Sequence, residues 1–367
     1  MVLLIIAWIT VILLLVRLIV VAVNFMTWPL LPKGRPRRGP LVSILIPARN
    51  EEENIEALLE DLEKQEYGNI EVLIFDDEST DRTYEIARSF AAGSSVNAEV
   101  LRSEGLPAGW MGKNHACHRL AEEASGDYLL FLDADVSVKP SLIPDSLDFL
   151  VRNKLDLLSL FPVQIMKSFG EKLTVPMMNW FLLTLLPMIL IRKSKRPSFA
   201  AANGQFMLFR SGVYRRYRFH EMLRNQPVED IHIQREMKKL DRRAATLLSG
   251  GQISCRMYTS AREGVIGFSR NVAEFFGGSH TLLLLYLLFT TLGPFILWDQ
   301  WGWEFLAGYL LIVLLKKAMV SVLSRQSVIM NMLLAFPQQV SAWMMGLRSL
   351  SSRWKRELKW KERTLRI

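Results

Sequence analysis

The chain has 367 residues, half of them hydrophobic and 22% charged, which is too apolar for a disordered chain and unusually apolar for a soluble domain. Its two cysteines are too few for a disulfide framework and lack the Cys/His spacing of a zinc module. Basic residues outnumber acidic ones by 45 − 36 = 9, an excess that either nucleic acid or the cytoplasmic surface of a membrane would explain.

The first 25 residues predict a transmembrane anchor. Residues 2–25 are apolar except for Thr10, Arg17 and Asn24, and a helix of about 20 such residues crosses a bilayer. The segment lacks the basic start and the small-residue end of a cleaved signal peptide, so we expect it to be retained. A basic linker follows over residues 26–41, and the positive-inside rule places it in the cytoplasm.

Residues 42–271 predict a single α/β domain in which strands alternate with helices. Strands are expected over residues 43–47, 70–75, 98–101 and 127–132, the first two of them buried, and helices over 54–64, after 81 and over 115–124. This order predicts a doubly wound, mostly parallel sheet, whose ligands bind beyond the carboxyl ends of the strands. The first strand is followed by no GxGxxG sequence, and the chain has no Walker lysine loop, which excludes dinucleotide oxidoreductases and P-loop ATPases.

Two aspartates follow the fourth predicted strand. Asp133 and Asp135 are one residue apart, so their side chains point the same way while Ala134 turns toward the sheet. Carboxylates with open coordination positions suit Mg²⁺ or Mn²⁺, which would neutralise the diphosphate that leaves a nucleotide sugar. The alternative for the pair is a solvated turn.

Polar residues also end the first two strands. Asp76 and Asp77 are placed to accept hydrogen bonds from a base or a ribose, and the alternative is a turn and helix cap. Asn50 and Glu51 lie where they could frame a nucleobase. Lys113 follows a glycine-flanked loop before a helix, so it is either a phosphate ligand or a solvated lysine.

A further acidic pair, Glu229 and Asp230, opens an amphipathic segment over residues 231–240. An acid at a helix start commonly interacts with the helix dipole. Inverting sugar transfer, however, requires one carboxylate that deprotonates the acceptor hydroxyl. The spacing alone leaves both readings open for Asp230.

The C-terminal region 272–347 predicts further membrane segments. Candidate spans are residues 281–298, 303–323 and 329–347. The tail 348–367 is basic and is expected in the cytoplasm, so an even number of crossings is required. We therefore expect the first two to span and the third, which contains Pro337, to be interfacial or re-entrant.

A central apolar stretch, residues 173–191, is also long enough to span. A crossing there would place Asp230 and Asp135 on opposite sides of the membrane. We expect instead a helix that lies in the interface, with its basic end at anionic headgroups.

Four motifs, at residues 43–52, 76–81, 133–135 and 229–230, resemble in order those of family 2 inverting glycosyltransferases with the GT-A fold. The resemblance covers residues 42–271. It implies that Asp77 with Asp76 holds the nucleoside, that Asp135 with Asp133 holds the metal diphosphate, and that Asp230 is the catalytic base. The candidate nucleotide-sugar-binding residues are Pro47, Ala48, Arg49, Asn50, Glu51, Asp76, Asp77, Lys113, Asp133, Ala134 and Arg256.

Residues 109–113, 255–258 and 267–271 are similar to membrane glycosyltransferases of carotenoid or hopanoid pathways. The Gln-x-x-Arg-Trp sequence that processive polysaccharide synthases carry after the base is missing, which argues against polymer extrusion. Arg256 or Arg270 could contact the diphosphate instead, and a membrane-facing arginine is the alternative.

The expected protein is therefore a multi-pass enzyme of the plasma membrane with a cytoplasmic catalytic domain. It would transfer a sugar from a nucleotide sugar, UDP-linked by our expectation, to a lipid acceptor such as a carotenoid or hopanoid-type lipid. The alternatives are transfer to a polyprenyl phosphate and an inactive nucleotide-sensing scaffold. Because the basic tail adjoins a membrane segment, we expect lipid headgroups rather than nucleic acid as its partner.

Overall fold

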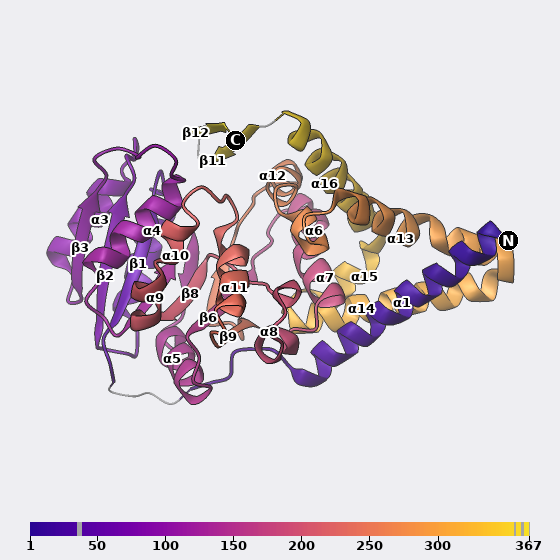
Figure 1. The fold of residues 1–367 in the computed structure, drawn as a ribbon, viewed down its shortest axis with the longest axis horizontal. Helices are drawn as coiled ribbons and strands as arrows, with labels where there is room; N and C mark the ends of the chain where they lie inside the picture. The colour runs from indigo at the N-terminus through magenta and orange to yellow at the C-terminus, as the bar shows by residue number, and fades with distance from the viewer. Residues whose placement is uncertain (35–38, 356, 361–362, 367) are drawn as a thin grey trace. The chain divides into compact units, whose positions relative to one another are not determined.

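The computed structural model describes residues 1–34, 39–355, 357–360 and 363–366, and the chain folds into two compact units (Figure 1). The helical unit comprises Met1–Pro29, Gln164–Ile189 and Met257–Ile367. The sheet unit comprises Leu30–Val163 and Leu190–Arg256. Each unit is thus assembled from segments that are separated in the sequence.

The sheet unit is built on a seven-stranded sheet with the order β3-β2-β1-β4-β8-β6-β9. Its strands are β1 (Val42–Ala48), β2 (Ile70–Asp76), β3 (Asn97–Arg102), β4 (Tyr128–Leu132), β6 (Leu157–Phe161), β8 (Phe206–Arg210) and β9 (Ala244–Leu248). β1 runs parallel to β2 and β4, β2 runs parallel to β3, and β6 runs parallel to β9. β8 is antiparallel to both of its neighbours. The prediction of a mostly parallel sheet is confirmed.

Burial along the strands explains why their sequences predict them well. β2 is buried at every position, as a central strand covered on both faces should be, and it is a continuous apolar run apart from Glu71 and Asp76. The edge strand β3 is half-buried or exposed throughout. A small second sheet has the strand order β5-β10-β7: β5 (Val136–Val138) pairs antiparallel with β10 (Ile253–Cys255), and β7 (Val163–Gln164) is the third strand.

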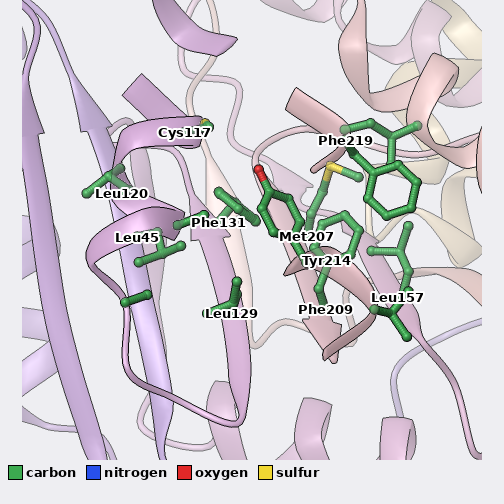
Figure 2. Packing of buried hydrophobic residues seen from close by; sticks show 14 of the residues in the cluster. Leu45, Cys117, Leu120, Leu129, Phe131, Leu157, Met207, Phe209, Tyr214 and Phe219 are labelled. Atoms are coloured by element: carbon green, nitrogen blue, oxygen red, sulfur yellow. The ribbon is translucent and has the colours of Figure 1, made fainter. Parts of the chain in front are cut away.

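Helices between the strands cover the sheet, and α4 packs against β1 and β2. The helices are α2 (Ile55–Glu63), α3 (Thr83–Gly93), α4 (Gly112–Glu123), α5 (Leu142–Arg152), α8 (Ile189–Lys193), η1 (Pro197–Phe199), α9 (Ser211–Tyr217), α10 (Phe219–Met222) and α11 (Glu229–Lys239). Figure 2 shows the main core, where Leu45, Phe131, Phe209, Tyr214 and Phe219 are buried together. Leu45 of β1 and Phe131 of β4 belong to this core, which anchors both strands.

A buried carboxylate ties β1 and β2 to the turn before β4. Glu71 accepts hydrogen bonds from the Ser43 hydroxyl, from the Ser125 amide at 2.8 Å and from the Ser125 hydroxyl at 2.7 Å. The Ser43 hydroxyl in turn accepts one from the Gly126 amide at 2.8 Å. Burial alone would raise the pKa of Glu71, but these hydrogen bonds outweigh it and lower the pKa.

Gly126→Ala is expected to destabilise the sheet unit. An added Cβ would lie 2.5 Å from the Ser43 hydroxyl oxygen and 2.8 Å from the Ser43 nitrogen, so the turn must move away from β1. Overpacking of this kind costs about 1–3 kcal/mol, which a lower melting temperature in detergent would reveal. Gly68→Ala is the control, because its Cβ would meet nothing within 4 Å. Equal melting temperatures for the two variants would contradict the expectation.

The helical unit contains three helices that are long and apolar enough to cross a membrane: α1 (Val2–Thr27), α13 (His280–Trp301) and α14 (Trp303–Leu323). They coincide with the segments that the sequence predicts as spans. Ala7 and Leu14 of α1 pack with Leu297 of α13 and Tyr309 of α14. The remaining elements are α6 (Phe169–Thr174), α7 (Pro176–Leu185), α12 (Ala261–Phe268), η2 (Val272–Phe276), α15 (Val328–Leu333), α16 (Ala335–Lys355), β11 (Glu357–Trp360) and β12 (Arg363–Arg366).

The structure corrects the expectation of one helix over residues 173–191. The stretch is divided among α6, α7 and α8, and α7 ends where Leu186 takes an extended conformation with φ −122° and ψ 116°. Leu186 precedes Pro187, and a residue before proline avoids the helical region. The predicted third segment, residues 329–347, is likewise divided between α15 and α16 and is not a candidate span.

The predicted basic linker and tail are described only in part. Residues 35–38 of the linker and residues 356, 361–362 and 367 of the tail lie outside the described residues. Within the tail, β11 pairs antiparallel with β12.

Candidate active site

The parallel strands bring the polar residues that follow β1 and β2 to one edge of the sheet. The register pairs Ala48 with Asp76, and the Asp77 amide donates to the Ala48 carbonyl at 2.9 Å. The Arg49 guanidinium donates to the Asp77 carbonyl and lies 3.8 Å from the Asp77 carboxylate. Pro47 and Ala48 thus form the end of the strand, and Arg49 joins the loop after β1 to Asp77.

Asn50 and Glu51 join the loop after β1 to the loop after β2. Asn50 has a positive φ of 53°, a conformation that asparagine tolerates. Its Oδ1 accepts a hydrogen bond from the Thr80 amide at 2.9 Å, and its own amide donates to Ser79 at 3.1 Å. The Glu51 amide donates to the Thr83 hydroxyl at 2.7 Å. These contacts give both residues a role in shaping the loops around the predicted nucleoside site.

Asp76 is buried without the hydrogen bonds that a buried carboxylate normally has. Neither of its oxygens has a hydrogen-bond partner among the described residues, and the nearest cation is Arg102, whose Nε lies 3.8 Å away. Leaving a buried acceptor unsatisfied costs about 1–3 kcal/mol. A ligand that donates hydrogen bonds would remove that cost.

Burial along the Asp133–Ala134–Asp135 turn alternates as its spacing predicts. Ala134 is buried, while Asp133 and Asp135 are half-buried. Asp135 Oδ1 accepts a hydrogen bond from Gln205 Nε2 at 3.2 Å, and the same nitrogen lies 2.9 Å from Cys255 Sγ. Arg256, the next residue, is exposed.

A lysine links this turn to the acidic pair on α11. Lys113, at the start of α4, lies 2.8 Å from Asp133 Oδ1 and 3.3 Å from Glu229 Oε1. Asp230 Oδ2 accepts a hydrogen bond from the Gly204 amide at 2.9 Å. A Cβ on Gly204 would lie 3.0 Å from Lys113 Nζ and 3.7 Å from Asp230 Cβ, so the glycine faces the same cluster.

The electrostatics of this cluster favour protonation at two of its acids. Burial, helped by the neighbouring Glu229, raises the pKa of Asp230 to about 7. Burial also raises the pKa of Asp133 to about 6, although Lys113 opposes the shift. Burial alone would lower the pKa of Lys113, but the charges of Asp133 and Glu229 outweigh it and raise the pKa well above its usual value.

The donor set fits a divalent cation that completes its coordination with a ligand. The described residues contain no group of three or more His, Cys, Asp or Glu side chains that could hold a metal by themselves. Mg²⁺, however, is commonly held by about one or two carboxylates together with substrate phosphates and water. Asp133 and Asp135 meet that pattern.

Two site residues, Gly204 and Gln205, escape prediction from the sequence. They precede β8, contact Asp230 and Asp135 respectively, and carry no motif. The only signal is a glycine and an amide directly before a buried strand.

Comparisons with known proteins identify the class of this domain. Residues 43–218 match the family described as Glycosyl transferase family 2, so this part of the chain is a family 2 glycosyltransferase domain, as its motifs predict. The structure also resembles that of the mannosyltransferase PcManGT from Pyrobaculum calidifontis in complex with GDP-Man and Mn²⁺, with a TM-score of 0.56 and 15% identity over 94% of this chain and 99% of that one. This similarity confirms the GT-A-like fold.

Curated relatives match a shorter segment. Over 97 residues the chain is 40% identical to the 4,4'-diaponeurosporenoate glycosyltransferase of Staphylococcus haemolyticus. This matched segment makes up 26% of this chain and 24% of the relative. Over 135 residues it is 36% identical to the Staphylococcus aureus protein of the same name, and this segment makes up 35% of this chain and 34% of that relative. The matched segments thus span between a quarter and about a third of these relatives.

Proposed function

We propose that the protein is a membrane-bound inverting glycosyltransferase that transfers a sugar from a nucleoside diphosphate sugar to a lipid acceptor. The observation that carries the proposal is the cluster of Lys113, Asp133, Glu229 and Asp230. It brings the carboxylate predicted to bind metal and the carboxylate predicted to act as base together at the edge of a GT-A-like sheet. Neither a turn nor a helix-dipole role requires that convergence.

In this proposal the donor is held along the carboxyl edge of the sheet. Asp76 and Asp77 accept hydrogen bonds from the nucleoside, and the unsatisfied oxygens of Asp76 support this role. Asp133 and Asp135 hold Mg²⁺ or Mn²⁺. The bound ion supplies Lewis-acid neutralisation of the leaving diphosphate. Lys113, which lies beside Asp133, adds a positive charge on the same side.

Asp230 acts as the base. The acceptor oxygen forms a bond to the anomeric carbon while the bond from that carbon to the diphosphate oxygen breaks, and the acceptor proton passes to the Asp230 carboxylate. A base works best when its pKa lies near the working pH, and burial beside Glu229 raises that of Asp230 to about 7. The hydrogen bond from the Gly204 amide fixes the carboxylate in place.

The fall of kcat at low pH is expected to follow the protonation of Asp230. Because its pKa is about 7 and the protonated form cannot accept a proton, kcat should fall as the pH drops below 7. One unit below the pKa, at pH 6, about a tenth of the plateau rate should remain. Glu229→Gln should move this fall to lower pH, because it removes the neighbouring negative charge. A rate that stays constant down to pH 5 would contradict the assignment.

The proposed setting is the plasma membrane, with several crossings and the sheet unit in the cytoplasm. Three helices of sufficient length and apolarity support the crossings, and the basic linker and tail support the orientation. The names of the relatives support a carotenoid-type acceptor, with a hopanoid-type lipid as the related possibility. A UDP-sugar remains our expectation for the donor.

Donor turnover by the purified protein tests the proposal. The full chain in detergent would receive a panel of UDP- and GDP-sugars, Mg²⁺ or Mn²⁺, and a total lipid extract. The expected result is metal-dependent nucleotide release together with a new glycolipid. Acid lability of the product would distinguish a sugar phosphodiester, formed on a polyprenyl phosphate, from a glycoside or ester. Failure of every nucleotide sugar to bind or to be consumed would overturn the proposal.

A further inference from the structure

Three basic side chains are buried together inside the helical unit. Arg17 of α1 is 3% exposed, and Lys316 and Lys317 of α14 are 0% and 5% exposed. All three approach the ring of Trp180 on α7. The Arg17 guanidinium carbon lies 4.8 Å from the ring centroid, Lys317 Nζ lies 4.4 Å from it and Lys316 Nζ lies 5.8 Å from it. We call these three residues the buried cation cluster.

The partners of the cluster are neutral. Arg17 donates to the Thr184 hydroxyl at 3.0 Å and lies over the ring of Tyr286 at 4.8 Å. Lys317 donates to the side-chain oxygen of Gln338. Among the described residues, Lys316 Nζ has no hydrogen-bond partner. Across the part of the chain that the structure describes, no carboxylate forms an ion pair with any of the three cations.

Such a cluster is costly unless something compensates it. A buried charge without a counter-ion costs several kcal/mol, and ionisable side chains within membrane segments mark functional sites. Lysines close to a helix end can extend to the surface. Lys316 and Lys317 do not, whereas the neighbouring Leu315 is 49% exposed. The three charged side chains therefore point into the interior of the helical unit and away from its outer surface.

The depth of the cluster indicates which molecules reach it. At about 1.5 Å per residue, Lys317 lies about 9 Å from the end of α14 at Leu323, and Arg17 lies about 15 Å from the end of α1 at Thr27. The proposed topology places both ends at the cytoplasmic face. A lipid whose head group enters the helical unit from the cytoplasmic face would reach the cluster. Its hydrocarbon chain would remain among apolar side chains.

We propose that the buried cation cluster binds the oxyanion of an anionic amphipathic lipid, either a phosphate monoester or a carboxylate. Lys316 Nζ donates a hydrogen bond to the oxyanion, and the negative charge of the oxyanion offsets the positive charges of Arg17 and Lys317. The rings of Trp180 and Tyr286 pack against the first carbons of the lipid. This site lies in the helical unit and stands apart from the proposed sugar transfer, because it requires neither donor nor metal.

Binding of matched lipid pairs to the full chain in neutral detergent tests this proposal. The probes are farnesyl phosphate against farnesol, oleate against oleyl alcohol, and inorganic phosphate alone, with affinity measured by native mass spectrometry and by the shift in melting temperature. The two anionic lipids are expected to bind at least tenfold more tightly than their neutral partners. Inorganic phosphate is expected to bind weakly, since it lacks the apolar chain.

Lys316→Met provides the decisive variant. It should weaken binding of both anionic lipids at least tenfold, and the lipid-free variant should melt at the same temperature as the parent or higher, because an uncompensated buried charge is removed. Lys316→Arg, which keeps the charge, should retain binding. Arg262→Gln, on the exposed surface of α12, is the control and should change neither property.

Several outcomes would overturn the proposal. They are equal affinity for neutral and anionic lipids, equal affinity for inorganic phosphate and farnesyl phosphate, or unchanged lipid binding in Lys316→Met. A Lys316→Met protein that melts lower and binds lipid as the parent does would assign the lysine to the fold alone. Nucleotide binding by the sheet unit is measured separately, so failure of the lipid site and failure of sugar transfer are distinguishable.

Discussion

Asp230→Asn is expected to lower kcat by about 100-fold to 10,000-fold, the usual contribution of a general base, while nucleotide affinity stays within about twofold of the parent. Asparagine has nearly the same size, and its side-chain oxygen can still accept the hydrogen bond that the Gly204 amide now donates to Asp230 at 2.9 Å. It cannot take up the acceptor proton. Steady-state turnover and nucleotide binding, measured on the same preparation, separate these two effects.

The control for this variant comes from the same part of the chain. Asp241 follows α11, is 69% exposed and pairs with Lys195 at 2.8 Å. Asp241→Asn removes the same charge from the surface and should leave kcat unchanged. If Asp230→Asn turned over donor at the parental rate, Asp230 would have no part in the chemistry. If it lost nucleotide binding as well, the loss of turnover would have to be assigned to a disturbed site.

Asp135→Asn is expected to remove the dependence of donor binding on metal and to lower turnover by at least about 100-fold. Loss of residues that only support a metal ligand costs about 10–100-fold, and loss of a ligand should cost no less. The side-chain oxygen of asparagine can still accept from Gln205 Nε2, which lies 3.2 Å from Asp135 Oδ1. The measurement is nucleotide affinity across a titration with Mn²⁺, repeated with Mg²⁺.

Glu60→Gln is the matched control for this second variant, because Glu60 of α2 is 64% exposed and pairs with Lys64, the residue after that helix. It should reproduce the parental titration. A titration of Asp135→Asn that coincides with the parental one would show that the cation, if required, is held elsewhere.

Local patterns in the sequence predict most of the sheet unit. The continuous apolar runs of β1 and β2 predict both strands to within a residue of their observed ends. A short apolar run without polar alternation is typical of a parallel strand that is buried on both faces. The i, i+2 spacing of Asp133 and Asp135 predicts two side chains on one side of the turn, with Ala134 buried. These features depend on residues that are close in sequence.

Contacts between distant segments are what the sequence leaves open. The ion pairs of Lys113 join Asp133, 20 residues away, to Glu229 on α11, and no spacing rule links these positions. Gly204 and Gln205 acquire their roles because β8 enters the sheet antiparallel between β4 and β6. That placement is set by tertiary packing and has no local signal. The break before Pro187, by contrast, has a local cause that a rule for residues before proline could have found.

The interleaving of the two units limits how a soluble catalytic fragment can be obtained. Removing the chain before Leu30 and after Arg256 would still leave residues 164–189, which belong to the helical unit. Their Leu183 and Leu186 carbonyls would lose the hydrogen bonds from Asn24 at 2.9 Å, and the apolar face of α7 would be uncovered. A fragment that stays in solution would therefore need an internal excision with a short bridge, in addition to trimming at both ends. Removal of the two ends alone should yield a protein that aggregates or remains bound to detergent.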